Sequence, residues 1–464
     1  YSAICSISGC TLDKSMSKEA ITDSYLLRIS GDQKLPSRDT GRNAQKKDNA
    51  DEDNVLKGGL VLEPHIGMQE GIACFDAAGL YPSIIIGFNI SPESKKDDGP
   101  ISISDDRGGT YRFQDKHEKP GIIPKICEDF KRIRKESKEK KAFAAKSFGE
   151  SSPEYIRAHQ FDAAIKTVMN GVYGVVGNPA FRLFDLDCAN AITSVGRNII
   201  RGLAEELESK NFPAVYGDTD SIFAKVQSLE NVPAAKIIIT DYLGSRLRES
   251  GVDSDAIDVQ FEKFFTRLLF KRREKRRNVW IPVKKKYVGY MTFADDHPCD
   301  IIFIRGFETR RSDTSKILNE KMMEFFISVV QKNDLKSGLK MLKELKESFP
   351  KLNPYEFAVP RAMHKEVESS PWFRGMRYAQ QHCGYKFDEE TAPRLLYIKR
   401  VIGGFPGTDA FCIQEGMEVP KWLEIDYNLM FEKVIRKKFS PILHELGINW
   451  DKEFNGVKDL DEWF

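Results

Sequence analysis

Residues 214–226 read AVYGDTDSIFAKV, and apolar residues alternate on both sides of the central Gly-Asp-Thr-Asp. This pattern predicts two strands joined by a tight turn. Asp218 and Asp220 lie two residues apart, and the side-chain period of a strand is also two, so we expect both carboxylates on one face. Two converging carboxylates can hold Mg²⁺. Taken alone, however, an Asp-x-Asp is more often a turn motif.

A third carboxylate, Asp76, strengthens the metal interpretation. It ends the strand-like run IACFD and is followed by a compact turn, AAGLYPS. The turn can bring Asp76 to the Asp218/Asp220 pair. Two metal ions about 3.5–4 Å apart, bridged by carboxylates, form the usual clamp for in-line phosphoryl transfer.

A second set of residues has the spacing of a triphosphate site. Arg134 and Lys138 are four residues apart and share one face of an expected helix, and a second expected helix presents Lys166, Asn170 and Tyr173 on one face. Such groups can grip phosphates and position a nucleotide. Spacing alone leaves open the alternative that Lys166 and Asn170 are surface residues and Tyr173 is core. No GxxxxGK[ST] loop occurs, so a P-loop site is excluded.

Several further elements are expected from the pattern of apolar residues. Helices are predicted over 17–30, 125–148, 154–173, 188–209 and 426–446, and strand-like runs broken by turns over 58–64 and 71–90. Residues 32–54 are almost wholly polar and predict a mobile loop. Strands and helices do not alternate regularly, which favours the α+β class.

The charge of the chain is segregated. The 464 residues are 41% hydrophobic and 30% charged, an ordinary globular composition, and the net charge is only +2. Yet residues 263–287 hold 11 Lys or Arg against Glu274 alone, interleaved with aromatic residues on an expected hairpin, and residues 131–146 hold 8 against Glu136 and Glu139. Such blocks favour a polyanion-binding surface. A solvated helix face is the alternative, and it competes more strongly for the second block.

Cysteine usage and the apolar runs favour an intracellular, reducing setting, in cytoplasm, nucleoid or nucleus. The eight cysteines include no CxxC pair, so neither a zinc ribbon nor a disulfide framework is indicated. No apolar run approaches the ~20 residues of a membrane span. The N-terminus lacks the pattern of a secretory signal. It begins with Tyr1 rather than Met, which indicates a fragment or a processed chain.

Five elements together resemble family B DNA polymerases. Residues 76–85 (DAAGLYPSII) resemble motif A, residues 166–174 (KTVMNGVYG) resemble motif B, and residues 216–221 (YGDTDS) match motif C without a change. Residues 284–287 (KKKY) resemble the KKxY element of the family, and residues 305–313 (RGFETRRSD) its KGxExxRRD element. The five follow the family's order across about 240 residues.

The resemblance implies a right-hand architecture of the α+β class. It implies a palm with an antiparallel sheet over residues 56–120 and 187–340, helical fingers over 121–186 and a thumb over 341–464. An N-terminal segment, residues 1–55, precedes them and contains the expected loop.

The resemblance also implies roles for single residues. Asp76 and Asp220 would be the main ligands of two Mg²⁺ ions, helped by the carbonyl of Ala77, by Asp218 and by Glu262. The residues implied for the nucleotide are Arg134, Lys138, Lys166, Asn170, Tyr173, Gly79, Leu80 and Tyr81, the last under the sugar. Those implied for primer–template DNA are Lys284, Lys285, Lys286, Tyr287, Gly289, Arg305, Arg310 and Arg311.

The sequence departs from the family at two small residues and in extent. Gly79 and Gly171 stand where motifs A and B usually have Ser, which removes a hydroxyl and loosens the backbone beside the nucleotide. About 75 residues precede Asp76, too few for the exonuclease domain that the family carries there, so we expect polymerisation without proofreading, with the exonuclease on a separate polypeptide or the chain truncated. The last residues, VKDLDEWF, resemble a sliding-clamp peptide only faintly, because Val457 replaces its glutamine.

The leading interpretation is therefore a template-directed DNA polymerase that uses deoxynucleoside triphosphates. A catalytically silent, DNA-binding subunit of a replisome is the first alternative. The intact Asp76, Asp218 and Asp220 count against it, because crowded carboxylates are costly without metal. A metal-dependent nuclease is the second alternative, and it leaves Arg134, Lys138, Lys166 and Asn170 unexplained.

Overall fold

The chain forms two compact units in a computed structural model that describes residues 2–31, 35–36, 56–106, 108–276, 279–307, 314–361, 369–388 and 391–456. Unit 1 comprises Tyr1–Leu62 and Ala73–Glu262, and unit 2 comprises Glu63–Ile72 and Lys263–Phe464. Helices and strands are mixed, and the strand pairs with a recorded register are all antiparallel, which confirms the α+β class. Among the described residues, no helix has both the length and the apolar character needed to cross a membrane.

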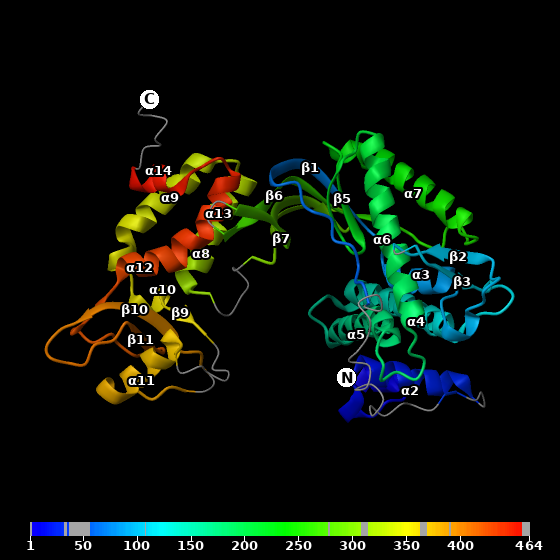
Figure 1. The fold of residues 1–464 in the computed structure, drawn as a ribbon, viewed down its shortest axis with the longest axis horizontal. Helices are drawn as coiled ribbons and strands as arrows, with labels where there is room; N and C mark the ends of the chain where they lie inside the picture. The colour runs from blue at the N-terminus through cyan, green and yellow to red at the C-terminus, as the bar shows by residue number, and fades with distance from the viewer. Residues whose placement is uncertain are drawn as a thin grey trace. The chain divides into compact units, whose positions relative to one another are not determined.

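Unit 1 is rich in helices (Figure 1). They are α1 (Ser2–Ser8), α2 (Lys18–Ser30), α3 (Leu80–Gly87), α4 (Ile122–Phe148), α5 (Pro153–Val176), α6 (Leu186–Ser209) and α7 (Val232–Glu249), with short 3₁₀ turns η1 (Leu12–Lys14), η4 (Pro92–Ser94) and η5 (Leu229–Asn231). Several begin at side-chain caps, such as Ser17 for α2, Ser152 for α5 and Asp185 for α6. The helices predicted over 17–30, 125–148, 154–173 and 188–209 are thereby confirmed.

Six strands are hydrogen-bonded in the order β4-β5-β1-β6-β7-β8. They are β1 (Gly67–Asp76), β4 (Ala214–Asp218), β5 (Ser221–Lys225), β6 (Gln260–Arg276), β7 (Val279–Ala294) and β8 (His297–Arg305). In unit 1, β2 (Ile101–Ser104) and β3 (Thr110–Phe113) form a separate hairpin. The hairpins predicted around residues 218–220 and over the basic block 263–287 are both present.

Unit 2 continues with a helical layer and a small sheet. Its helices are α8 (Lys316–Phe326), α9 (Leu335–Ser348), α10 (Pro354–Phe357), α11 (Pro371–Cys383), α12 (Tyr427–Phe431), α13 (Lys437–Glu445) and α14 (Trp450–Asn455), with the π-helical η7 (Ile327–Gln331) and η9 (Glu432–Arg436) and the 3₁₀ turn η8 (Phe349–Lys351). The small sheet has the order β11-β10-β12, with β9 also paired to β10. Its strands are β9 (Val359–Pro360), β10 (Arg394–Val401), β11 (Ala410–Ile413) and β12 (Leu423–Ile425).

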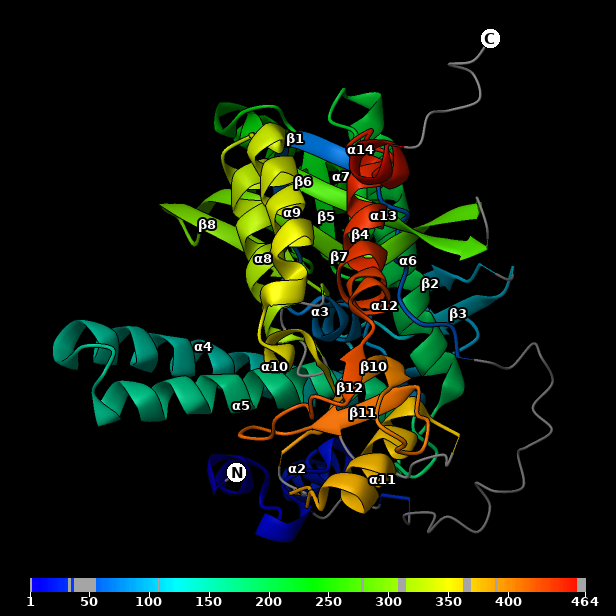
Figure 2. The same cartoon turned by 90° about the vertical axis from the view of Figure 1, so that its left-hand side faces the viewer.

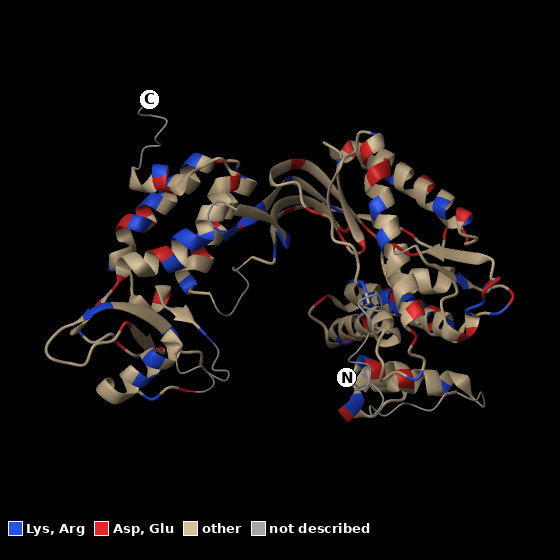
Figure 3. Cartoon of the chain, viewed as in Figure 1, with Lys and Arg blue, Asp and Glu red and all other residues tan. Residues whose placement is uncertain are grey.

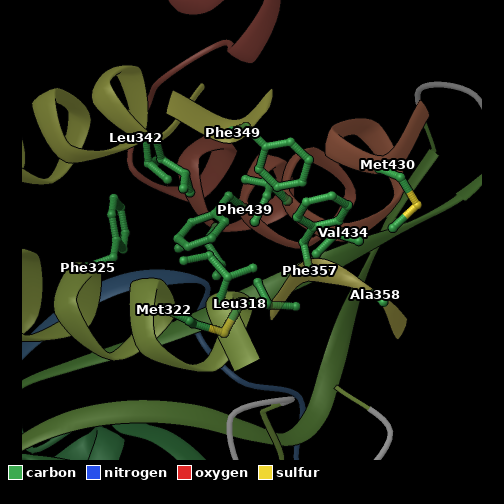
Figure 4. Packing of buried hydrophobic residues seen from close by; sticks show 14 of the residues in the cluster. Leu318, Met322, Phe325, Leu342, Phe349, Phe357, Ala358, Met430, Val434 and Phe439 are labelled. Carbon is green, nitrogen blue, oxygen red and sulfur yellow. The ribbon is translucent and has the colours of Figure 1, made fainter. Parts of the chain in front are cut away.

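The core of unit 2 is formed by apolar side chains of these helices and strands (Figure 4). Phe325 of α8 meets Phe439 of α13 edge to face, with ring centroids 5.4 Å apart, and Phe349 packs on Phe357 at 4.7 Å. All four rings are at most 1% exposed. Aromatic pairs of this kind add to the stabilisation that burial gives.

Three predictions of local structure differ from the structure. The run at 80–87, expected to be strand-like, is the helix α3, and residues 58–64 contribute only an isolated bridge between Val61 and Asp218. Ile84 and Ile85 are fully buried, so this short run shows no alternation that would separate helix from strand. The helix predicted over 426–446 is divided into α12, η9 and α13. The loop predicted over 32–54 lies outside the described residues, apart from 35 and 36.

Candidate active site

The β4–β5 hairpin turns at Thr219 and Asp220, since Asp218 pairs with Ser221. Thr219 has φ = +63°, and the N–H of Asp220 donates to the carbonyl of Asp218 at 2.7 Å. The strand therefore ends at Asp218, and the period-two argument for a shared face does not apply to Asp220. The two carboxylate residues differ in environment: Asp218 is 8% exposed, whereas Asp220 is exposed.

A backbone hydrogen bond joins this turn to the end of β1. The N–H of Ala77 donates to the carbonyl of Asp220 at 2.8 Å, and β1 lies next to β5 in the sheet. Asp76, half-buried, is the last residue of β1. The fold thus brings the segments that carry Asp76 and Asp220 into direct contact, although 143 residues separate them.

Glu262 lies on β6, the strand on the other side of β1. The rings of Phe75 and Phe261 meet with centroids 6.0 Å apart, so both side chains occupy one face of the sheet. Side chains alternate along a strand, so the next residues, Asp76 and Glu262, both point to the opposite face. Nevertheless, no three His, Cys, Asp or Glu side chains of the described residues form a group that could by itself hold a metal ion.

Residues 57–62 support the β4–β5 hairpin through backbone hydrogen bonds. The sequence analysis did not predict this contact. The N–H of Thr219 donates to the carbonyl of Leu60 at 2.9 Å, and the N–H of Leu62 donates to the carbonyl of Gly217 at 2.9 Å. Arg197, 5% exposed on α6, donates to the carbonyls of Lys57 and Gly58, both at 3.2 Å. Arg197 also forms an ion pair with Asp106, at 2.7 Å. Because Lys57, Gly58 and Asp106 are all remote from Arg197 in the chain, the sequence gives no local signal for this buried arginine.

Tyr81, in the first turn of α3, lies close to both hairpin acids. Burial, with smaller contributions from Tyr173 and the negative charge of Asp220, raises the pKa of Tyr81 to about 12. Its ring packs on that of Tyr173 of α5, with centroids 4.6 Å apart. A side chain at Gly59 would collide with the Tyr81 hydroxyl, since its Cβ would lie 2.6 Å away. Tyr81 is thus a neutral, tightly packed side chain at neutral pH.

The glycine in motif A has a conformational reason. Gly79 has φ = +72° and ψ = +50° at the start of α3, in the left-handed region where residues with a Cβ are strained. A Cβ there would also lie 3.2 Å from Met169 Cε. Glycine therefore adopts this left-handed turn without the strain that a residue with a Cβ would carry.

The glycine in motif B accommodates the N-terminal helices. A Cβ at Gly171 would lie 2.7 Å from Cδ of Lys18, the first residue of α2. Helix α2 runs beside the α4–α5 pair (Figure 2). Two hydrogen bonds hold it there: the Tyr25 hydroxyl donates to the Asp129 carboxylate at 3.0 Å, and the Asn178 amide donates to the Glu19 carboxylate at 2.9 Å. The small residue thus allows close helix packing.

The expected phosphate-binding residues are only partly gathered. Arg134 and Lys138 line a cavity of ≈ 430 Å³ together with Ala78 and Ser83 of the motif A segment. Lys166 and Asn170 are exposed on α5 and do not line it. The Nε of Arg134 is buried without a hydrogen bond, 3.9 Å from Asp162 Oδ1. Asp162 is a further residue that sequence reasoning missed.

In unit 2, the KKKY element is a bulge. Phe270 pairs with Tyr287 but Arg272 pairs with Pro282, so the single residue Lys271 faces four residues, 283–286, of β7. Lys285 has φ = +62°, and Lys284 and Lys285 are exposed. Lys and Arg recur along β6 and β7 (Figure 3).

The RGF element packs directly on this bulge. A Cβ at Gly306 would lie 2.3 Å from the Lys285 carbonyl, so glycine permits the approach. Tyr287 is 4% exposed and packs on Phe270 and Phe303, and Gly289 is buried against Phe265. Arg305 is exposed at the end of β8. Arg310 and Arg311 lie outside the described residues.

The model of a known family, DNA polymerase family B, matches residues 5–370. The chain belongs to DNA polymerase family B. Its relatives in this family include DNA polymerase 1 of Pyrococcus abyssi, 29% identical over 308 residues, which are 65% of this chain and 35% of that polymerase. DNA polymerase 1 of Saccharolobus solfataricus is 26% identical over 426 residues, 88% of this chain and 43% of that polymerase.

A solved family B polymerase has the same fold. The enzyme of the hyperthermophilic archaeon Pyrobaculum calidifontis matches with a TM-score of 0.63 and 21% identity, covering 96% of this chain and 54% of that chain. The expected right-hand polymerase fold is thereby confirmed. The chain spans about half or less of the length of these family B polymerases.

Proposed function

We propose that this chain is a template-directed DNA polymerase, which adds deoxynucleoside triphosphates to the 3′ end of a primer. The observation that carries the proposal is the hydrogen bond from Ala77 to Asp220, which joins the ends of motifs A and C. Family membership supports the reaction class, and the cavity beside motif A, lined by Arg134 and Lys138, supports a triphosphate as substrate.

Asp76 and Asp220 would hold two Mg²⁺ ions, with the carbonyl of Ala77 as a further oxygen donor. That carbonyl accepts one hydrogen bond, from Leu80 N–H at 3.0 Å, and keeps a second lone pair. These hard oxygen donors fit Mg²⁺, which takes few protein carboxylates and completes its shell with water and phosphate oxygens. When bound, such ions stabilise the attacking and leaving oxygens of an in-line displacement. Asp218 and Glu262 are proposed as auxiliary acids.

The other residues bind and orient the substrates. Arg134, Lys138 and Lys166 would neutralise the phosphates, since cations aimed at developing charge lower the barrier most in a dry site. Asn170 and Tyr173, with Gly79, Leu80 and Tyr81, would position the nucleotide. Lys284, Lys285, Lys286 and Arg305 would contact the phosphates of primer–template DNA. Tyr287 and Gly289, which the sequence proposed for the DNA, are buried, and we propose that they support this surface from beneath.

The regions proposed from the sequence remain our proposal: palm 56–120 and 187–340, fingers 121–186, thumb 341–464. A separate exonuclease-bearing polypeptide is a proposed partner. The sliding-clamp contact proposed for 457–464 falls outside the described residues.

Primer extension tests the function directly. The purified chain is incubated with a labelled primer, a template, Mg²⁺ and the four deoxynucleoside triphosphates, one omitted at a time. We expect extension that stops opposite the template base whose partner is missing. A chain that binds the primer–template without extending it would support the silent, DNA-binding subunit instead.

A further inference from the structure

Helix α4 carries a stripe of four basic residues, of which the sequence singled out only two. Lys131, Arg134, Lys135 and Lys138 are spaced i, i+3, i+4 and i+7, so they share one helix face. All four line the cavity of ≈ 430 Å³ beside motif A. The neighbouring Arg132 lies on another face, paired with Asp129 at 3.2 Å and with Glu136 at 3.1 Å. Only this face of α4 lines the cavity with basic residues, and the other basic residues of the block 131–146 do not line it.

Lys131 is the member of the stripe that is anchored to motif A. Its Nζ donates to Oγ of Ser83 at 3.1 Å, and Ser83 is only 3% exposed. An exposed lysine ordinarily samples many rotamers, and ordering it on a ligand costs conformational entropy. The hydrogen bond to a buried hydroxyl already restrains the ammonium group at the cavity wall. A ligand in the cavity would therefore meet a cation that is largely preorganised.

The charge of the cavity selects for a polyanion. Asp255 and Asp258, from the segment between α7 and β6, line the same cavity and offset part of the positive charge. Four cations against two carboxylates leave an excess of positive charge. Ala78, Met169 and Ala256 supply the other walls and no charge. A linear polyphosphate, with several negative charges along its length, matches four cations spread over two helical turns.

We propose that Lys131 is a further triphosphate-binding residue, held in position by Ser83. The proposal rests on the proposed polymerase function and extends it from the residues that match family motifs to one that does not. Lys131 binds the phosphate tail of the incoming nucleotide with Arg134 and Lys138, and Ser83 positions Lys131 from the motif A helix. Lys131 therefore acts on nucleotide binding and takes no part in the chemical step.

The test uses the full chain and compares Lys131→Met with Lys131→Arg, and with Arg132→Met as a matched control on another face. Primer extension gives KM for the nucleotide and kcat, and inorganic tripolyphosphate, as a competitive inhibitor, probes the phosphate site alone. In Lys131→Met we expect both KM and the tripolyphosphate Ki to rise about tenfold, because the variant loses one charge-assisted hydrogen bond to the phosphates. We expect kcat to stay nearly unchanged. Lys131→Arg should restore both constants, and Arg132→Met should leave both as they are.

The outcomes separate this inference from the proposed function. If the unmodified chain fails to extend primers, the polymerase proposal is wrong, and tripolyphosphate binding measured by calorimetry still tests Lys131. If the chain extends primers and Lys131→Met leaves KM and Ki unchanged, Lys131 does not bind the triphosphate. In that case its hydrogen bond to Ser83 only fastens α4 to α3, and Lys131→Met and Ser83→Ala would lower the melting temperature alike.

Discussion

One backbone hydrogen bond sets the geometry of the proposed catalytic residues. Ala77 N–H reaches the carbonyl of Asp220, so neither side chain has to hold the two segments together. The contact between the two segments is made by backbone atoms, which mutation of the side chains does not remove. Substitutions at Asp76 or Asp220 should therefore change charge without disrupting the hairpin.

Tyr81 is predicted to exclude ribonucleotides. Its ring is packed against Tyr173 and Gly196, so it has little room to yield to a 2′-hydroxyl. Tyr81→Ala should raise the use of ribonucleotides relative to deoxyribonucleotides. Tyr81→Phe keeps the ring and should keep the discrimination. The ratio of kcat/KM for the two sugars checks this, and an equal ratio in Tyr81→Ala and the unmodified chain would show that the ring does not act as a gate.

At the scale of elements, the contact of α2 with α5 predicts a coupling between Gly171 and Lys18. Alanine is favoured over glycine inside a helix by about 1 kcal/mol, but here its Cβ would press on the Lys18 stem. Gly171→Ala alone should therefore gain little or lose stability. Lys18→Ala removes the Cγ and Cδ atoms that the new Cβ would press on. In a chain that carries Lys18→Ala, Gly171→Ala should therefore raise the free energy of unfolding by roughly 0.5–1 kcal/mol.

Thermal unfolding of the four members of this double-mutant cycle measures the coupling. Additive effects of the two substitutions would mean that α2 does not press on Gly171. Gly171→Ser, which restores the residue usual in motif B, should show the same dependence on Lys18.

The bulge on β7 predicts a salt-dependent contribution to DNA binding. Lys284 and Lys285 are exposed there, and each phosphate that a lysine neutralises contributes about −0.9 to the slope of log K against log salt. Changing both to Ala should make the slope shallower by up to about 1.8 without altering sequence preference. Fluorescence anisotropy over a salt series measures it.

The control for this experiment is a pair of exposed lysines of unit 2 outside the block, Lys332 and Lys336. Their double Ala variant should keep the slope of the unmodified chain. Equal slopes in both double variants would show that the bulge is only a solvated surface.

The elements with strong local signals were predictable, and those set by distant contacts were not. The hairpin at 218–220 follows from alternation around a turn, and α2, α5 and α6 follow from the pattern of their apolar residues. Helix α3 was missed because Ile84, Ile85 and Ile86 form a short apolar run whose residues show no alternation that would separate helix from strand. The bulge at Lys284–Lys286 was missed because the residue that packs on it, Gly306, follows a different strand, β8. At the site, Lys131 and Arg197 were missed because their partners are remote in sequence: Ser83 for Lys131, and Asp106 and the carbonyl of Lys57 for Arg197.

For the molecule as a whole, we predict that the 464-residue chain does not shorten primers. An exonuclease needs its own acidic metal cluster on a folded domain, and the described residues of the first 31 form helices packed on α5 and α4. A labelled primer with a mismatched 3′ end, incubated with Mg²⁺ and no nucleotides, should keep its length. Shortening by the pure chain that is lost on mutating Asp76 or Asp220 would contradict this prediction.

The central claim is that Asp76 and Asp220 form the polymerase centre of this chain, and the single-turnover rate of primer extension tests it most directly. Asp220→Asn keeps the size of the side chain and removes its charge, so we predict a rate lower by roughly a thousandfold or more, since each ~1.4 kcal/mol lost is tenfold. Asp218→Asn should cost less. Asp253→Asn, at an acid paired with Lys116 at 2.6 Å, serves as the matched control and should extend primers normally. A near-normal rate for Asp220→Asn, in a chain that still binds primer–template DNA, would contradict the account.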